Sequence, residues 1–181
     1  MEQAGRLDLL HERRSAHQTI GVTGRSILLR DQAPLHRGNM ELPSGYSFER
    51  FVESLNRRVF FWPGTEEQPI SYGVRHFRRY ENENPVILRT CSDSLHRRNP
   101  QAVPLFCRYN SGSPRCSRGK KSPRGPDTFV PAQEFDGTAA DVAEVTFTEE
   151  IFLPDDTEMG RQPKGPWHPL KRNIPVLGNN L

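Results

Sequence analysis

The stretch Phe51–Trp62, with the sequence FVESLNRRVFFW, constrains the fold of this chain more than any other window. In its first half, Phe51, Val52 and Leu55 have the spacing of one apolar helix face. Its second half is a β-branched and aromatic run that stops at Pro63, which is typical of a buried strand. Because aromatic side chains bury large areas, we expect a central helix-to-strand junction here, in the core.

Other windows predict short elements separated by long loops. A helical pattern covers residues 1–19, and residues 74–80 predict a second short helix. Ser47 is placed to cap the helix that contains Phe51. Strands are expected at residues 27–29, 86–88, 103–109 and 142–147. Several strands, few helices and no regular strand–helix alternation favour the α+β class over a doubly wound sheet.

The composition favours one domain with a modest core. The 181 residues suit a single domain, but only 34% are hydrophobic and the mean hydropathy is −0.74. Sixteen prolines and fourteen glycines indicate long connections. We predict an α+β domain over residues 1–155 and a Pro/Gly-rich tail over 156–181. No apolar run approaches about 20 residues and no signal peptide opens the chain, so we expect a cytoplasmic protein without a membrane span.

The cysteines and histidines form no recognisable metal or disulfide pattern. Cys91, Cys107 and Cys116 include no C-x-x-C pair, and an odd number argues against a secreted disulfide framework. The sequence also has no P-loop, no G-x-G-x-x-G and no nucleophile elbow. We therefore expect structural thiols and no metal site.

Positive charge is concentrated in one loop. From Arg108 to Arg124 there are six basic residues and no acid, among turn-forming residues. Guanidinium groups and backbone N–H groups suit phosphate oxygens, in a dinucleotide or in a nucleic acid, although a solvated surface loop is the alternative. Tyr109 and Phe129 flank the loop and would stack a base or a nicotinamide ring, or only anchor it. The candidate phosphate ligands are Arg108, Arg115, Arg118, Lys120, Lys121 and Arg124.

Glu144 is an acid within an otherwise apolar strand pattern. Alternation places it on the face opposite Ala143, Val145 and Phe147. In a cleft, such a carboxylate stabilises a developing cation or orients a nucleophile. The alternative is the exposed face of an edge strand. Arg14 lies at the end of the first predicted helix, where a cation also satisfies the helix dipole.

Five motifs, in this order, are shared with an uncharacterised bacterial domain family, which the chain resembles over residues 5–155. More distantly, the chain resembles the ADP-ribosyltransferase superfamily, especially the DarT-type toxins that modify single-stranded DNA with NAD. The motifs are LLRDQAPL at 28–35, LNRRVFFW at 55–62, YNSGSP at 109–114, RGPDTFVP at 124–131 and AEVTF at 143–147.

The distant resemblance implies split β-sheets, NAD as co-substrate and Glu144 as the catalytic residue. Arg13-Arg14 is similar to the helix end that bears an NAD-contacting arginine, so we assign Arg14, with Tyr109 and Ser111, to cofactor binding. The implied reaction cleaves the nicotinamide–ribose bond, in a toxin or defence protein that acts on single-stranded nucleic acid. The acceptor, an antitoxin and the oligomeric state are not identified. The alternative is a non-catalytic nucleic-acid-binding or interaction module that uses residues 108–124.

One feature of those toxins has no counterpart here. They usually begin with a strand that carries a Tyr-His-Met/Ile-Thr-like motif, and its histidine contacts the NAD ribose. This chain begins at about the following helix, and neither His11 nor His17 sits in a matching motif. Either its start lies further upstream, or the strand is absent and the chain is a degenerate binding module.

Overall fold

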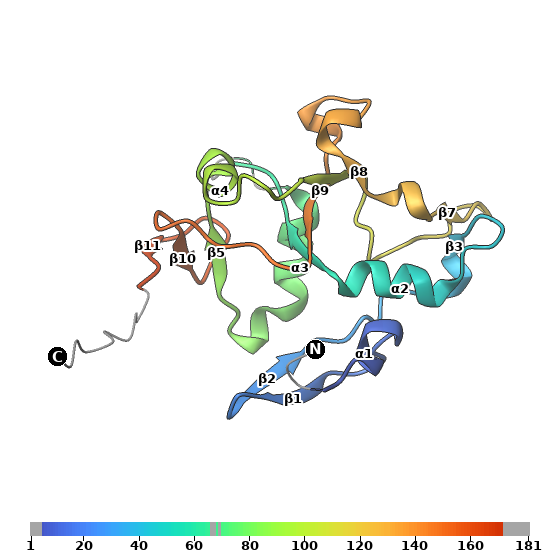
Figure 1. Ribbon diagram of the computed structural model, residues 1–181, viewed down its shortest axis with the longest axis horizontal. Coiled ribbons are helices and arrows are strands. Elements are labelled where there is room, and N and C mark those ends of the chain that lie inside the picture. Colours follow the sequence, from blue (N-terminus) through green and yellow to red (C-terminus); the bar gives the residue numbers. More distant parts are fainter. Residues whose placement is uncertain (1–4, 66–67, 69, 172–181) are drawn as a thin grey trace. The chain divides into compact units, whose positions relative to one another are not determined.

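The computed structural model describes residues 5–65, 68 and 70–171 (Figure 1). The chain divides into two compact units, each built from two segments. Unit 1 comprises residues 1–63 and 102–151, and unit 2 comprises residues 64–101 and 152–181. Short helices and small sheets occur in both units, which confirms the α+β class. The domain boundary expected at residue 155 stays a prediction, and residues on both sides of it belong to unit 2.

The core of unit 1 is organised around helix α2 (Phe48–Asn56). The helix begins after Ser47, whose hydroxyl oxygen accepts a hydrogen bond from the Arg50 amide at 3.2 Å, as predicted. Phe51 and Val52 are fully buried and Leu55 is nearly so. They pack in one cluster with Leu35, Met40, Cys107 and Phe129. Each such side chain contributes roughly 1.5–3 kcal/mol by its burial, so the helix-to-strand junction expected at Phe51–Trp62 is confirmed as a core element.

Four antiparallel strands form the central sheet of unit 1, in the order β4-β9-β6-β8. Phe61 pairs with Val145, and its ring lies edge-on to Phe147 at 5.9 Å. Strand β4 is half-buried along its length rather than fully buried as expected. Strand β9 is an interior strand, between β4 and β6. The strands are β4 (Arg58–Phe61), β6 (Leu105–Cys107), β8 (Val130–Pro131) and β9 (Glu144–Thr148).

The N-terminal part of unit 1 differs from the expected helix over residues 1–19. Helix α1 spans only Asp8–His11, and β1 (Gln18–Val22) pairs with β2 (Arg25–Leu29) in an antiparallel hairpin. Thr23 and Gly24 both have positive φ at the turn, which is typical of a tight two-residue hairpin loop. The β-branched residues of β1 gain cross-strand partners there, and β2 contains the strand expected at residues 27–29.

Short elements complete unit 1. Strand β3 (Met40–Glu41) pairs in parallel with β7 (Ser122–Pro123). The Arg124 amide extends this pairing by donating to the Glu41 carbonyl at 2.9 Å. Four 3-10 helices connect the strands: η2 (Arg37–Asn39), η4 (Pro126–Thr128), η5 (Ala132–Glu134) and η6 (Ala139–Asp141).

Unit 2 contains a three-stranded antiparallel sheet in the order β11-β10-β5. Arg89 of β5 donates to Glu158 of β10 at 2.6 and 2.9 Å, and its guanidinium lies 4.6 Å from the Trp167 ring centroid. Two strands thus lie in the segment predicted as a tail, of which residues 172–181 are outside the described part. The elements are α3 (Ser71–Tyr80), η3 (Glu81–Glu83), β5 (Ile87–Arg89), α4 (Ser92–Arg98), β10 (Glu158–Gly160) and β11 (His168–Pro169).

Every helix within the described residues is too short or too polar to cross a membrane.

Candidate active site

Glu144 is the first residue of β9, and its side chain is only 3% exposed. It pairs with Cys107 of β6, and the preceding Ala143 amide donates to the Cys107 carbonyl at 2.8 Å. These backbone contacts fix the position of Glu144 in the central sheet of unit 1. The alternative of an exposed edge strand is wrong, because β9 is interior and Glu144 is buried.

The Glu144 carboxylate is held by the turn that follows β6. The backbone amide of Ser111 donates to both carboxylate oxygens, at 3.2 Å each. Ser111 is fully buried, and its turn is closed by a hydrogen bond from the Ser113 amide to the Asn110 carbonyl. Residues 33 positions apart in the sequence are therefore joined at one buried point.

Arg124 is the second buried charge of this group, with 5% of its surface exposed. Its guanidinium donates to three backbone carbonyls: Ser111 at 3.2 Å, Asn110 at 3.1 Å and Pro123 at 2.8 Å. The same guanidinium stacks 4.2 Å from the centroid of the Tyr109 ring. Through these hydrogen bonds Arg124 links the two ends of the segment 110–124. It is buried and bonded to backbone, whereas its sequence context suggested an exposed phosphate ligand.

Burial sets the electrostatics of the group. It raises the pKa of Glu144 to about 6, against the opposing effects of Ser111 hydrogen bonding and the Arg124 charge. A pKa of about 6 leaves the carboxylate mostly ionised at pH 7, because one pH unit is a factor of about ten. Burial also raises the pKa of Cys107 to about 12, so its thiol stays neutral. Arg124 keeps its proton, although burial lowers its pKa.

A pocket of about 330 Å³ adjoins this group. Tyr109 and Arg124 line it, together with three prolines and the exposed carboxylates Glu41 and Asp127. Its volume is at the lower end of the roughly 300–1,000 Å³ of small-molecule sites. Glu144 does not line the pocket. A ligand in the pocket would therefore touch Tyr109 and Arg124 first.

The structure brings four predicted site residues together and leaves Arg14 in other contacts. Glu144, Ser111, Tyr109 and Arg124 form the group described above. Arg14 lies beyond the end of α1 and donates to the Arg30 carbonyl at 2.9 Å and to the Asn56 side chain at 3.0 Å. These bonds tie the end of β2 to α2.

The remaining predicted basic residues are exposed. Arg108 lies over the Phe135 ring, with its guanidinium carbon 4.5 Å from the centroid. Phe129 is 6% exposed and belongs to the core cluster, so it anchors the loop rather than presenting a ring for stacking. Arg115, Arg118, Lys120 and Lys121 lie further along the loop, outside the buried group.

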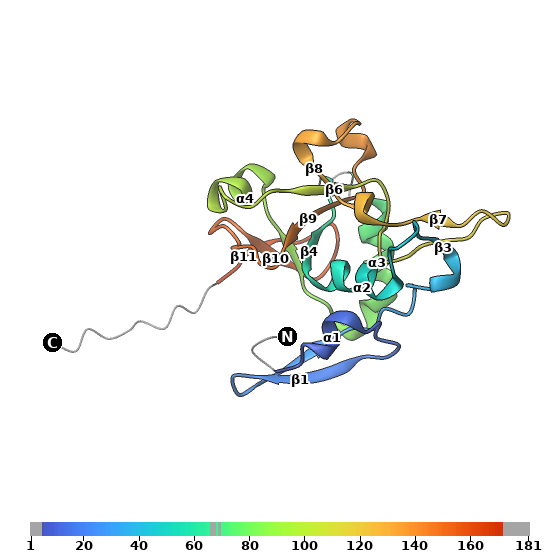
Figure 2. The ribbon, with the colours of Figure 1, turned by 45° about the vertical axis from the view of Figure 1, so that its right-hand side comes forward.

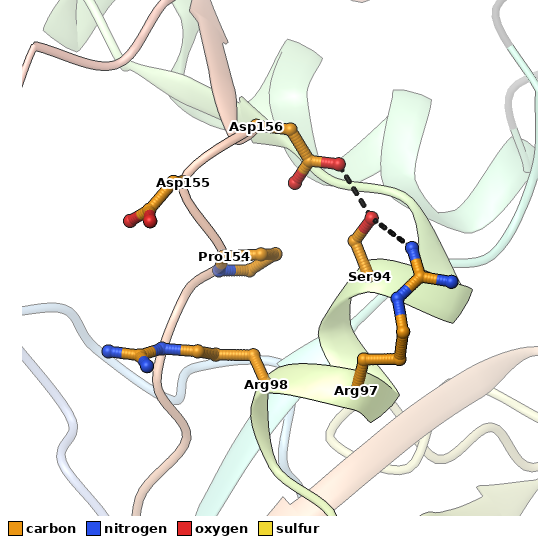
Figure 3. Close-up of a pocket in the computed structure, with 6 residues that line it drawn as sticks. All are labelled: Ser94, Arg97, Arg98, Pro154, Asp155 and Asp156. Carbon is orange, nitrogen blue, oxygen red and sulfur yellow. Dashed lines mark hydrogen bonds between the residues drawn. The ribbon is translucent and has the colours of Figure 1, made fainter.

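Unit 2 holds a second pocket, of about 400 Å³, which the sequence did not suggest (Figure 3). The Ser94 hydroxyl donates to Asp156 at 2.6 Å and accepts from Arg97, which also pairs with Asp93. In Figure 3, Arg97 and Asp156 turn toward Ser94, whereas Arg98 and Asp155 point away from it. Acids and bases are mixed around the pocket, so its charge selects no class of ligand. Within the described ranges, no three His, Cys, Asp or Glu side chains are grouped to hold a metal.

Comparison with known proteins identifies a family and no characterised relative. A model of a family of unknown function (DUF7002) matches residues 1–156. No curated protein and no solved structure matches the chain.

Proposed function

The chain belongs to this family of unknown function, DUF7002, and we propose that it is an NAD-dependent ADP-ribosyltransferase in which Glu144 is the catalytic residue. The observation that supports the proposal is the buried carboxylate on an interior strand, which the Ser111 amide holds at 3.2 Å. Ionisable groups with displaced pKa values, beside a pocket, are typical of functional sites. The sequence resemblance to ADP-ribosyltransferases independently assigns the same residue.

The environment of Glu144 suits the proposed chemistry. In the reaction, the bond between nicotinamide and C1′ of the ribose breaks, and its electron pair leaves with neutral nicotinamide. The ribose then carries positive charge, which an ionised carboxylate in a site of low dielectric stabilises strongly. An acceptor nucleophile forms the new bond to C1′ and loses a proton. A carboxylate with a pKa of about 6 is suited to accept that proton near neutral pH.

Tyr109 and Arg124 suit the binding of the dinucleotide. In this proposal the Tyr109 ring packs against nicotinamide or ribose, and Arg124 supplies positive charge for a phosphate. Glu41 and Asp127, on the same pocket, favour the cationic nicotinamide ring of NAD. Because Glu144 is 3% exposed, a substrate reaches it only after the Ser111 turn or the Arg124 side chain moves.

The test is transfer of label from NAD to nucleic acid and to total protein by the purified chain and by Glu144→Gln. Glutamine keeps the size and one acceptor oxygen, so the Ser111 hydrogen bond and the fold are preserved. We expect the transfer rate to fall by roughly 100-fold or more, because the charge on the transition state loses its partner.

Glu150→Gln is the matched control, because Glu150 is an exposed acid just after β9. It should transfer label at the wild-type rate. Equal transfer by wild type and Glu144→Gln, or no transfer and no NAD binding by the wild-type chain, would exclude the proposal.

A further inference from the structure

The segment 115–122 forms a short hairpin, which we call the basic finger. Ser117 and Lys120 exchange two backbone hydrogen bonds, at 3.0 and 2.9 Å. Arg118 and Gly119 form the turn, both with positive φ, as in a two-residue hairpin loop. At the base, the Ser122 hydroxyl donates to the Arg115 carbonyl at 2.6 Å and accepts from the Arg115 amide. Figure 2 shows this segment extending away from β3 and β7.

The basic finger carries four exposed positive charges and no negative one. Arg115, Arg118, Lys120 and Lys121 are all exposed, and among the described residues none of them has an ion-pair partner. The finger contains no acid. The net charge of the whole chain is +3 and the finger supplies four positive charges, so the rest carries a net charge of −1. The finger therefore presents four exposed cations with no acid among them, which attracts anions.

The chemistry of the finger favours phosphates over bases or lipid chains. It contains no aromatic or large aliphatic side chain that would stack on a base or enter a bilayer. The flanking rings lie outside the finger, because Tyr109 lines the pocket beside Arg124 and Phe129 is buried. Small Ser and Gly residues allow close approach of the backbone. A two-stranded ribbon also fits the major groove of a duplex, which is about 12 Å wide.

We propose that the basic finger is a binding site for the phosphate backbone of duplex nucleic acid. The guanidinium and ammonium groups would contact phosphates on either side of a groove and read no base sequence. Binding at the finger does not require the transferase activity, and it is measured without NAD. If the transferase proposal fails, the binding result still stands.

The test is fluorescence anisotropy of the full chain with a labelled DNA duplex and with one strand of the same duplex, between about 50 and 200 mM salt. We expect tighter binding to the duplex, with a slope of log K against log salt of about −3.5 for four phosphate contacts. The triple variant Arg118→Ala/Lys120→Ala/Lys121→Ala should make that slope shallower by roughly 2 to 3.

A matched control removes three exposed cations elsewhere, in Arg25→Ala/Arg78→Ala/Lys164→Ala. The change in net charge is the same, and this variant should keep nearly the wild-type slope. The proposal is overturned if the control weakens binding as much as the finger variant does. It is also overturned if the single strand, or vesicles with anionic lipid headgroups, bind more tightly than the duplex.

Discussion

The backbone of Ser111 lies between two buried charges of opposite sign. Its amide donates to Glu144, and its carbonyl accepts from Arg124. Each of these groups would cost several kcal/mol if it were buried alone, and Ser111 gives both a hydrogen-bond partner through its two adjacent peptide groups. The displaced pKa of Glu144 shows that burial is only partly compensated.

This incomplete compensation predicts a pH dependence of stability. The pKa of Glu144 is about 6 in the folded chain and 4.5 without burial. At a pH between these two values, Glu144 therefore binds a proton when the chain folds. The protonated carboxyl of Glu144 therefore favours the folded state, and this contribution to the free energy of unfolding is fully present below pH 4.5 and is lost as pH rises through 6. It amounts to about 2 kcal/mol, and it is measured by urea unfolding of wild type and Glu144→Gln across this range.

The comparison between the two proteins isolates Glu144 from other carboxylates, such as Asp8 and Asp141, whose pKa values are lowered. Relative to wild type, Glu144→Gln should gain stability as pH rises from 4.5 to 7. Parallel stability curves for the two proteins would contradict the assignment.

At the level of single residues, the sequence singled out Glu144, Ser111 and Arg124 as candidates but did not show how they are placed. Glu144 stood out because it interrupts an apolar strand, and the motif around Ser111 was visible. The contact between Ser111 and Glu144 could not be predicted, because it depends on the register of β6 against β9. For Arg124 the local charge density suggested exposure, whereas burial depends on a turn and a β3–β7 pairing distant in sequence.

Among the elements, α2 was predictable and should be the most sensitive to truncation. Phe51 is fully buried in the core cluster, so Phe51→Ala should lower the free energy of unfolding by about 3–5 kcal/mol. Phe152→Ala provides the control, because Phe152 is 59% exposed and its loss should cost less than about 0.5 kcal/mol. Chemical denaturation measures both, and equal losses would contradict the assigned core.

Elements with little apolar content were harder to find. Helix α4 contains a single buried apolar residue, Leu95, and its polar sequence gave no periodic signal. Strands β10 and β11 lie among prolines and glycines, and they form through pairing with β5 and through Arg89 and Trp167. The strand expected at residues 27–29 lies in β2, but its partner β1 was missed, since strand pairing is invisible to a local pattern.

For the whole molecule, the finger decides the sign of the net charge. Replacing Arg115, Arg118, Lys120 and Lys121 with serine changes the net charge from +3 to −1. We expect retention on a cation-exchange column at pH 7 to be lost, because the net charge becomes negative and four exposed cations are removed. The titration of Glu144, followed by NMR, should stay near pH 6, because no substituted residue contacts its carboxylate. A displaced titration would show that the finger and the buried group are coupled.

Arg124 holds the two ends of the segment 110–124 together, since its side chain donates to backbone carbonyls at both ends. The finger at the tip of this segment can lengthen, shorten or exchange its charges without touching the carboxylate, because Ser111 holds Glu144 and the β3–β7 pairing holds the base of the segment. Insertions in surface loops cost little when the loop ends are already held together. Exchange of the finger for another loop should therefore change what the chain binds and leave the residues around Glu144 in place.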